Sequence, residues 1–272
     1  MKPTIKQNMK AELEVAVLAA LEAGRAIMEI YKSDDFDVTV KGDNSPLTRA
    51  DVASHEVIMK HLNTTEFPVL SEEGKAIPVR ERQGWNTLWI VDPLDGTKEF
   101  IKRNGEFTVN IALVQNGRPV LGVIFVPVSG DLYFGSVEAG ARKTQTGSMD
   151  WTASEWMSRG DAIPFDQGER PHTVVASRSH MSAETEDYIQ ALRDEFGEVD
   201  LISKGSSLKL CMVAEGRADC YPRLAPTMEW DTAAGQAICT SAGCEVLNWE
   251  NSEELEYNRD NLLNPWFLVR RL

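Results

Sequence analysis

Residues 88–97 read Leu-Trp-Ile-Val-Asp-Pro-Leu-Asp-Gly-Thr, so that an apolar run ends abruptly in two carboxylates. A short apolar run bounded by Pro and Gly is typical of a buried β-strand. Burying two acids at its end is costly, because like charges raise each other's pKa or require a cation. The alternative is an ordinary turn that leaves Asp92 and Asp95 in water. This stretch alone fits both interpretations, so the other acidic positions must distinguish them.

The overall composition restricts the kind of protein this can be. The 272 residues suffice for one large domain or two subdomains, and 42% hydrophobic with 26% charged residues is typical of a globular protein. A net charge of -14 argues against nonspecific binding to nucleic acid or to an anionic membrane. No apolar run approaches the roughly 18 residues of a membrane helix, and the polar N-terminus does not resemble a signal peptide.

The cysteines favour a reducing compartment. They lie in the last quarter of the chain without a CxxC pair or zinc-site spacing: Cys211, Cys220, Cys239 and Cys244. We therefore expect reduced, mostly buried thiols in a cytoplasmic protein.

Hydrophobic periodicity predicts an α+β N-terminal half. Helical spacing covers residues 11–31, and a second helix runs from a capping box at Thr48–Asp51 to about Leu62. Strands are expected at residues 36–40, 67–70, 88–91, 107–114, 120–128 and 132–137. The last three are joined by short turns and must be antiparallel. We expect an exposed excursion up to Trp85 and an irregular segment at 144–170.

The C-terminal half is predicted to be α/β, because strands and helices alternate from His172 onwards. Helices are expected at 183–196, 206–215 and 232–242, and strands at 173–176, 198–202, 218–221, 245–247 and 266–269. Residues 250–260 read as an acidic exposed loop. We accordingly divide the chain into an α+β subdomain, residues 1–165, and an α/β subdomain, residues 166–272.

Several acidic side chains share one feature, which is that each lies where a predicted element starts or ends. They are Asp51 in the first turn of a helix, Glu72 and Glu73 after a strand, Asp92 and Asp95 after the next, and Asp231 immediately before a helix. Each alone is explained by a helix cap or a solvated loop acid. Together they predict carboxylates gathered at strand ends and helix starts, where ligand sites concentrate in α/β proteins.

Such a set of ligands points to a particular metal chemistry. Oxygen ligands without His or thiolate partners suit Mg²⁺ or Mn²⁺ better than zinc. The four histidines are not at metal-ligand spacing, and the chain has no P-loop motif. Carboxylates that hold Mg²⁺ typically serve phosphoryl chemistry. The bound ions would supply the positive charge that this acidic chain needs to attract an anionic substrate.

Three motifs together resemble the inositol monophosphatase-like, lithium-sensitive, Mg²⁺-dependent phosphatases. They are Glu72-Glu73, Asp92-Pro-Leu-Asp95-Gly-Thr97 and Trp230-Asp231-Thr-Ala-Ala-Gly235, in the family's order over nearly the whole chain. Within this family, residues 96–100 (Gly-Thr-Lys-Glu-Phe) resemble the corresponding segment of the 3'(2'),5'-bisphosphate nucleotidases, the CysQ-type branch. Inositol monophosphatases usually have Thr-Asn-Phe at this place. The resemblance implies a layered α-β-α-β-α sandwich of the sugar phosphatase type.

The resemblance also implies roles for individual residues. The metal ligands would be Glu72, Asp92, the Leu94 carbonyl, Asp95 and Asp231, holding two or three Mg²⁺ ions that Mn²⁺ could replace and that Li⁺ would inhibit. Thr97 would hold the attacking water, and Asp51 would accept the proton behind it, because a Thr hydroxyl is no base by itself. Glu73 would contact one of these metal ligands without binding the ion itself, or it would bind a further metal ion.

Substrate contacts follow from the same resemblance. The amides of Gly96 and Thr97 would meet phosphate oxygens beside Glu72, Leu94, Asp95 and Asp231. Ser206, Lys209 and Arg223 resemble positions that hold the second phosphate or the base, and His180 is a candidate for stacking on adenine. Solvated basic residues and a helix cap explain this second group equally well. Lys98 and Glu99 are typical of the nucleotidase branch, but the sequence assigns no role to either residue.

The sequence leaves three functions to be compared. The first is Mg²⁺-dependent hydrolysis of adenosine 3',5'-bisphosphate to AMP, and of its sulfated analogue, in sulfate assimilation. The second keeps this chemistry but acts on inositol monophosphate or fructose 1,6-bisphosphate. The third is a silent metal- or nucleotide-binding regulator, which the complete set of acidic residues disfavours. We expect a small phosphorylated nucleotide as partner and a cytoplasmic location, with peripheral attachment to the inner membrane and the oligomeric state left open.

Overall fold

A seven-stranded sheet carries the stretch of residues 88–97. In the computed structural model, which describes residues 5–33, 39–40, 46–145, 151–176 and 181–272, its strand order is β3-β4-β5-β6-β7-β8-β9. The strands are β3 (Val69–Ser71), β4 (Thr87–Asp95), β5 (Thr108–Gln115), β6 (Arg118–Val126), β7 (Asp131–Ser136), β8 (Gly140–Gln145) and β9 (Asp161–Ala162). β3 and β4 are parallel, and all other pairs are antiparallel, as the short turns require.

A second sheet has five strands in the order β11-β10-β12-β14-β13. They are β10 (His172–Val175), β11 (Val199–Ile202), β12 (Cys220–Arg223), β13 (Cys244–Asn248) and β14 (Phe267–Arg271). A small separate pair joins β1 (Thr39–Val40) and β2 (Pro46–Leu47). The proposed boundary at residues 165/166 lies between the two large sheets, yet one apolar core cluster includes strand residues of both, such as Leu88 and Val246.

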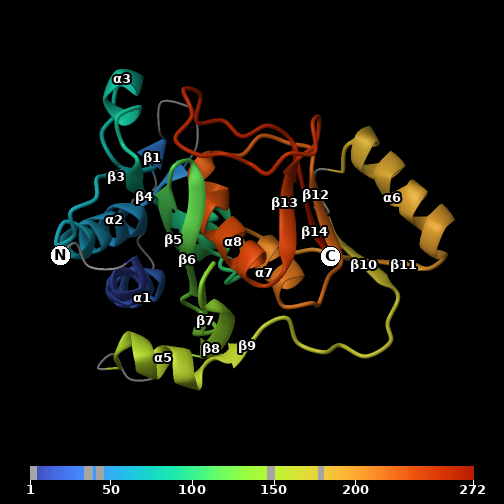
Figure 1. Ribbon diagram of the computed structural model, residues 1–272, viewed down its shortest axis with the longest axis horizontal. Helices are drawn as coiled ribbons and strands as arrows, with labels where there is room; N and C mark the ends of the chain where they lie inside the picture. The colour runs from blue at the N-terminus through green and yellow to red at the C-terminus, as the bar shows by residue number, and fades with distance from the viewer. Residues whose placement is uncertain (1–4, 34–38, 41–45, 146–150, 177–180) are drawn as a thin grey trace.

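Helices complete five layers, as Figure 1 shows. They are α1 (Ile5–Tyr31), α2 (Arg49–Leu62), α3 (Val79–Arg82), α4 (Thr97–Ile101), α5 (Ala153–Arg159), α6 (Ala183–Phe196), α7 (Leu208–Ala214) and α8 (Glu229–Ser241). α1 and α2 contact one face of the large sheet, and α8 with α7 lies between the two sheets. α6 contacts β11 and covers the outer face of the small sheet. The predicted α-β-α-β-α sandwich is confirmed.

The N-terminal predictions need three corrections. The first helix already begins at Ile5, and the apolar strand does not end at Val91 but continues as β4 to Asp95, with a register shift between Asp92 and Asp95. The Asp-Pro-Leu-Asp segment is therefore an irregular strand end that keeps its pairing with β5. Residues 144–170 contain α5, whose Thr152–Glu155 capping box is a signal that the expectation of an irregular segment overlooked. Residues 36, 38 and 41–45 lie outside the described part.

Two segments expected to be exposed are partly buried. The excursion before Trp85 includes α3, whose Arg82 is only 3% exposed. The acidic loop at 250–260 buries Leu255 and Tyr257. In both segments, buried side chains stand among polar ones without helical or strand periodicity, so sequence patterns could not reveal them. The four cysteines are free and buried, as expected. No described helix is both long and apolar enough to cross a bilayer.

The close approach of α8 to the large sheet depends on Gly122 in β6. A Cβ atom built there would lie 2.9 Å from the Ala237 Cβ and would also collide with the Ala234 carbonyl oxygen. We expect Gly122→Ala to lower the free energy of unfolding by about 1–3 kcal/mol, because the helix backbone must move away. Urea unfolding measures the loss. Gly84→Ala is the control, since its new Cβ would meet only the Glu81 oxygen at 3.6 Å; equal stability of the two variants would contradict the prediction.

Candidate active site

Asp51 lies in the first turn of α2 and serves two partners with its two oxygens. Its Oδ2 accepts hydrogen bonds from the Thr48 backbone N–H (2.7 Å) and the Thr48 hydroxyl (2.6 Å), which completes the predicted capping box. Its Oδ1 accepts a hydrogen bond from the Thr97 hydroxyl at 3.1 Å. Asp51 is 1% exposed. The helix cap thus fixes a buried carboxylate against the Thr97 side chain.

Thr97 is the first residue of α4 and directly follows a left-handed turn. Gly96 has φ = +93°, a conformation that residues with a Cβ rarely adopt. A Cβ at this position would also lie 3.2 Å from the Glu106 carbonyl oxygen. The Thr97 hydroxyl is 3.5 Å from the Leu94 carbonyl oxygen. Gly96 therefore permits the turn that brings the Thr97 hydroxyl back towards the end of β4.

The end of β4 places two acids around its register shift. The Asp92 Oδ1 accepts a hydrogen bond from the Leu94 N–H at 3.0 Å, and Asp92 itself is 1% exposed. The Asp95 Oδ2 lies 2.8 Å from the Ser207 hydroxyl and 3.3 Å from the Asn110 amide nitrogen. The bulge keeps both carboxylates at the strand end, so the interpretation with two solvated turn acids is wrong for Asp92.

Asp231 is the third residue of α8, so the expectation that it precedes the helix as an N-cap is wrong. The N-cap is Met228, whose backbone N–H donates to the Asp231 Oδ2 at 2.8 Å. The helix begins earlier than predicted, and Glu229 and Trp230 belong to its first turn. The Ser207 hydroxyl lies 2.8 Å from the Asp231 carbonyl oxygen and also contacts Asp95. Ser207 thus joins the two acidic segments, a role that the sequence did not reveal.

The four acids Glu72, Asp92, Asp95 and Asp231 interact strongly. Burial raises the pKa of Asp92 well above its usual range, and Glu72, Asp95 and Asp231 raise it further, with a hydrogen bond between the Asp92 and Glu72 carboxyls. Burial and then Asp95 raise the pKa of Asp231 to about 8, although the Met228 N–H and Arg223 act in the opposite direction. The cluster thus favours protons, or another cation, over four bare negative charges.

A hard divalent cation fits these donors, because they are carboxylates whose mutual repulsion it would relieve. As the side chains stand, no group of three or more Asp, Glu, His or Cys residues in the described part is arranged to hold a metal ion. Glu72 is well placed, since its backbone N–H donates to the Val91 oxygen at 3.1 Å and continues the β3–β4 pairing. Glu73 follows it and is half-buried.

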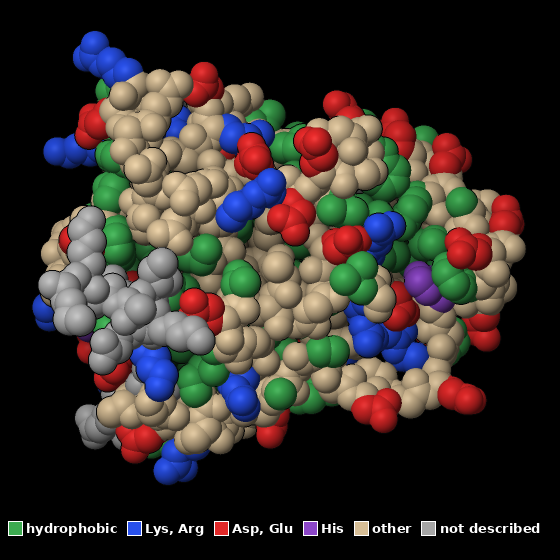
Figure 2. Space-filling model, in the orientation of Figure 1, with side chains coloured by type: hydrophobic (Ala, Val, Ile, Leu, Met, Phe, Trp, Pro, Cys, Tyr) green, Lys and Arg blue, Asp and Glu red, His purple; other side chains and the backbone are tan. Residues whose placement is uncertain are grey.

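A cleft of about 310 Å³ opens beside Asp95 and Asp231. Its lining includes Gly96 and the basic side chains Lys98, Lys102, Lys204, Lys209 and Arg223, together with the acidic side chains Glu99 and Glu106. Figure 2 shows both acidic and basic side chains spread over one face of the molecule. The lining thus carries five basic and four acidic side chains in a protein with a net charge of -14, so basic groups that suit an anionic ligand are concentrated here.

Of the residues predicted to hold the second phosphate or the base, Ser206, Lys209 and Arg223 line this cleft. Ser206 precedes α7 instead of opening it, because its φ of +44° is not helical. The Ser206 Oγ and Arg223 Nε are buried and lack a hydrogen-bond partner among the described residues. Burial lowers the pKa of Lys209, partly offset by Asp95. His180 and its neighbours 177–179 lie outside the described residues.

Comparisons with known proteins identify the family of this chain. The model of the inositol monophosphatase family matches residues 8–268. The 3'(2'),5'-bisphosphate nucleotidase CysQ of Escherichia coli (strain K12) is 49% identical over 255 residues, which are 92% of this chain and 96% of that protein. The crystal structure of CysQ from Bacteroides thetaiotaomicron has a TM-score of 0.90 and 54% identity, covering 96% of this chain and 97% of its own.

A more distant structure has the same architecture. Inositol monophosphatase from Anabaena (Nostoc) sp. PCC 7120 matches with a TM-score of 0.70 and 25% identity, covering 97% of this chain and 91% of its own. The chain therefore belongs to the inositol monophosphatase family, whose phosphatases generally depend on divalent metal ions.

Proposed function

We propose that this protein is a Mg²⁺-dependent 3'(2'),5'-bisphosphate nucleotidase that hydrolyses adenosine 3',5'-bisphosphate to AMP and phosphate. The observation that carries the proposal is the hydrogen bond from Thr97 to the buried Asp51, next to an acidic cluster that borders a basic cleft. The names of the relatives at 49% and 54% identity support the nucleotide as substrate. The sulfated analogue of this nucleotide, an intermediate of sulfate assimilation, is a second candidate substrate.

The proposed metal ligands are Glu72, Asp92, the Leu94 carbonyl, Asp95 and Asp231, with Glu73 behind them or at a further ion. Two or three Mg²⁺ ions would bind there, with Mn²⁺ as a substitute and Li⁺ as an inhibitor. When bound, the ions supply Lewis acidity and positive charge at the scissile phosphate. The raised pKa values of Asp92 and Asp231 support this assignment, because they reveal a cluster that lacks positive charge.

Thr97 and Asp51 would together remove a proton from the attacking water. The Thr97 hydroxyl donates its hydrogen to the Asp51 Oδ1, which leaves the Thr97 oxygen free to accept a hydrogen bond from water. As the water oxygen forms its bond to phosphorus, its proton passes to the Thr97 oxygen and the Thr97 proton passes to Asp51. The bond from phosphorus to the ribose 3'-oxygen breaks, and this oxygen takes a proton from solvent water as AMP departs.

The basic cleft would hold the rest of the nucleotide. Lys209 and Arg223 lie on its wall beside the acidic cluster, where they can neutralise a second phosphate. The partnerless Ser206 Oγ and Arg223 Nε support a ligand here, since buried polar atoms are usually hydrogen-bonded. The amides of Gly96 and Thr97, at the start of α4, would meet the scissile phosphate. An inositol phosphate has one phosphate and would leave part of this lining unused.

Phosphate release by the purified protein tests the proposal. Adenosine 3',5'-bisphosphate, inositol 1-phosphate and fructose 1,6-bisphosphate are compared side by side in Mg²⁺, with and without Li⁺ and a chelator. We expect the nucleotide to have the highest kcat/KM, and both Li⁺ and the chelator to abolish turnover. Preference for inositol or sugar phosphate would overturn the substrate assignment but keep the metal site. Inactivity on all three would favour the silent regulator.

A further inference from the structure

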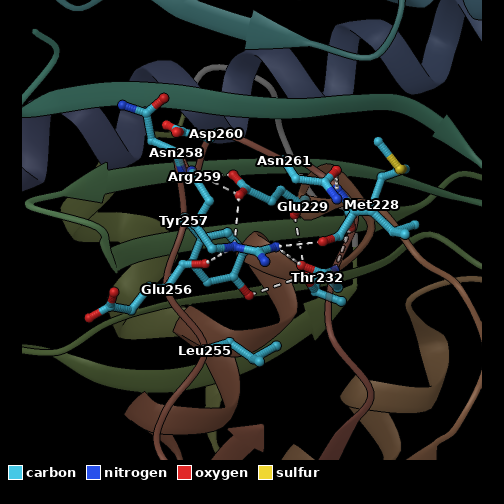
Figure 3. Close-up of polar contacts among 12 residues, drawn as sticks. Met228, Glu229, Thr232, Leu255, Glu256, Tyr257, Asn258, Arg259, Asp260 and Asn261 are labelled. Atoms are coloured by element: carbon cyan, nitrogen blue, oxygen red, sulfur yellow. Dashed lines mark hydrogen bonds and ion pairs between the residues drawn. The ribbon is translucent and has the colours of Figure 1, made fainter. Parts of the chain in front are cut away.

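A buried polar network lies at the first turn of α8, two residues before Asp231 in the chain (Figure 3). Its centre is Glu229, which is 0% exposed. The Glu229 Oε2 accepts a hydrogen bond from the Asn258 N–H at 2.6 Å, and its Oε1 accepts one from the Arg259 N–H at 3.1 Å. The Arg259 Nε is also 3.1 Å from the Glu229 Oε1. A buried carboxylate is stable only with such partners, so Glu229 fixes this part of the 255–264 loop on α8.

Arg82 holds the same loop from the opposite side. It lies in α3, the short helix that follows Glu72 and Glu73, and is 3% exposed. Its guanidinium donates to the Asn258 Oδ1 and the Arg259 carbonyl oxygen, both at 3.0 Å. The Asn258 amide returns a hydrogen bond to the Arg82 carbonyl oxygen at 2.8 Å. The loop is therefore a bridge between the segment after Glu73 and the start of α8.

The network continues to the carboxylate of Asp231. The Arg259 guanidinium donates to the Asn264 Oδ1 at 3.0 Å, and the Asn264 amide donates to the Met228 carbonyl oxygen at 2.7 Å. The same Asn264 amide lies 2.9 Å from the Thr232 hydroxyl. The Met228 N–H in turn holds the Asp231 Oδ2. Both peptide groups that flank the Met228 Cα are thus fixed, one by the loop and one by Asp231.

We infer that Glu229 and Arg82 are positioning residues, which set the place of Asp231 relative to Glu72 and thereby the affinity of the site for divalent metal. Neither side chain lines the cleft, so neither contacts a ligand there. The ion pair of Glu229 with Arg259 is by itself weak evidence for stability, whereas the hydrogen bonds through Asn258, Asn264 and Met228 fix the geometry at the start of α8. The inference rests on the proposed function, because it takes Glu72 and Asp231 as metal ligands.

Direct binding of Mn²⁺ to the full-length protein tests the inference, with free Mn²⁺ measured by its electron paramagnetic resonance signal. We expect Glu229→Gln and Arg82→Met to weaken Mn²⁺ binding about tenfold, the loss typical when groups that orient metal ligands are removed. The metal concentration for half-maximal turnover should rise in parallel, while kcat at saturating metal stays close to the wild-type value. If either variant fails to fold, Asn258→Ala replaces it and should also weaken Mn²⁺ binding.

Arg170→Met is the matched control. Arg170 binds both Asp219 oxygens and the Gly216 carbonyl oxygen in a comparable network, which borders a different cleft. This variant should lower Tm and leave the Kd for Mn²⁺ unchanged. The inference is overturned by folded Glu229→Gln and Arg82→Met proteins with wild-type Kd, or by an equal loss of affinity in Arg170→Met.

A further variant separates this inference from the proposed function. Asp231→Asn should bind Mn²⁺ far more weakly than Glu229→Gln, because it removes a ligand itself. Wild-type binding by Asp231→Asn would refute the metal-site assignment and the inference with it. Weak binding by Asp231→Asn together with wild-type binding by Glu229→Gln would refute the inference alone.

Discussion

Replacing Thr97 by Ala should lower kcat by roughly 10²–10⁴-fold, the contribution typical of a general acid–base group. The variant loses the hydroxyl that donates to the Asp51 Oδ1 at 3.1 Å. Asp51→Asn should cause a loss of the same order, since an amide cannot take the proton. The double variant should be little worse than either single one, because residues that act as a unit are not additive. Steady-state phosphate release at saturating Mg²⁺ measures all three.

Metal binding distinguishes this role from structural damage. Asp51 also caps α2 through Thr48, so Asp51→Asn should lower stability, whereas Thr97→Ala leaves the cap intact. Thr97→Ser keeps a hydroxyl at the same place and should retain most of the turnover. Mn²⁺ binding should survive in the Thr97 variants. Normal turnover of both Thr97→Ala and Asp51→Asn would show that another group activates the water.

The sequence revealed those parts of the site that depend on local signals. The capping box at Thr48 predicts where Asp51 lies, and the Asp-Pro-Leu-Asp-Gly-Thr motif places its residues within one strand end and one turn. Asp231 was identified, but its helix position was not, because an acid at N-cap and an acid at N3 look alike in a sequence.

Contacts between distant segments could not be predicted in this way. Ser207 meets Asp95 and Asp231, and Asn110 reaches Ser207 from β5, yet none of these pairs is close in sequence. Arg82 similarly looked like a charge in an exposed excursion, because all but one of its acceptors come from residues 258–260. The layered fold was predicted because hydrophobic periodicity is local, whereas such pairings follow only from tertiary packing.

Without metal, the protein should lose stability as the pH rises from about 5 to 8. The folded-state pKa values of Asp92 and Asp231 are raised above the unfolded values near 4, Asp231 to about 8. Between these limits the native state binds more protons than the unfolded state, so the free energy of unfolding falls with pH. The slope approaches about 1.4 kcal/mol per pH unit for each carboxyl that stays protonated. Urea unfolding in EDTA at a series of pH values measures it.

Asp231→Asn connects this pH dependence to the metal. The variant keeps the side-chain shape but loses the titrating proton, so in EDTA its stability should fall less steeply with pH than that of the wild type. Asp200→Asn, at an exposed position of β11, controls for the charge change and should keep the wild-type slope. Mg²⁺ at 100 times the Kd of the wild type should raise the free energy of unfolding of the wild type by about 2.7 kcal/mol. The same Mg²⁺ concentration should stabilise Asp231→Asn much less. Both effects arise from the same uncompensated negative charge. If the free energy of unfolding of the wild type depended on neither pH nor Mg²⁺, these acids would neither repel one another nor bind the ion.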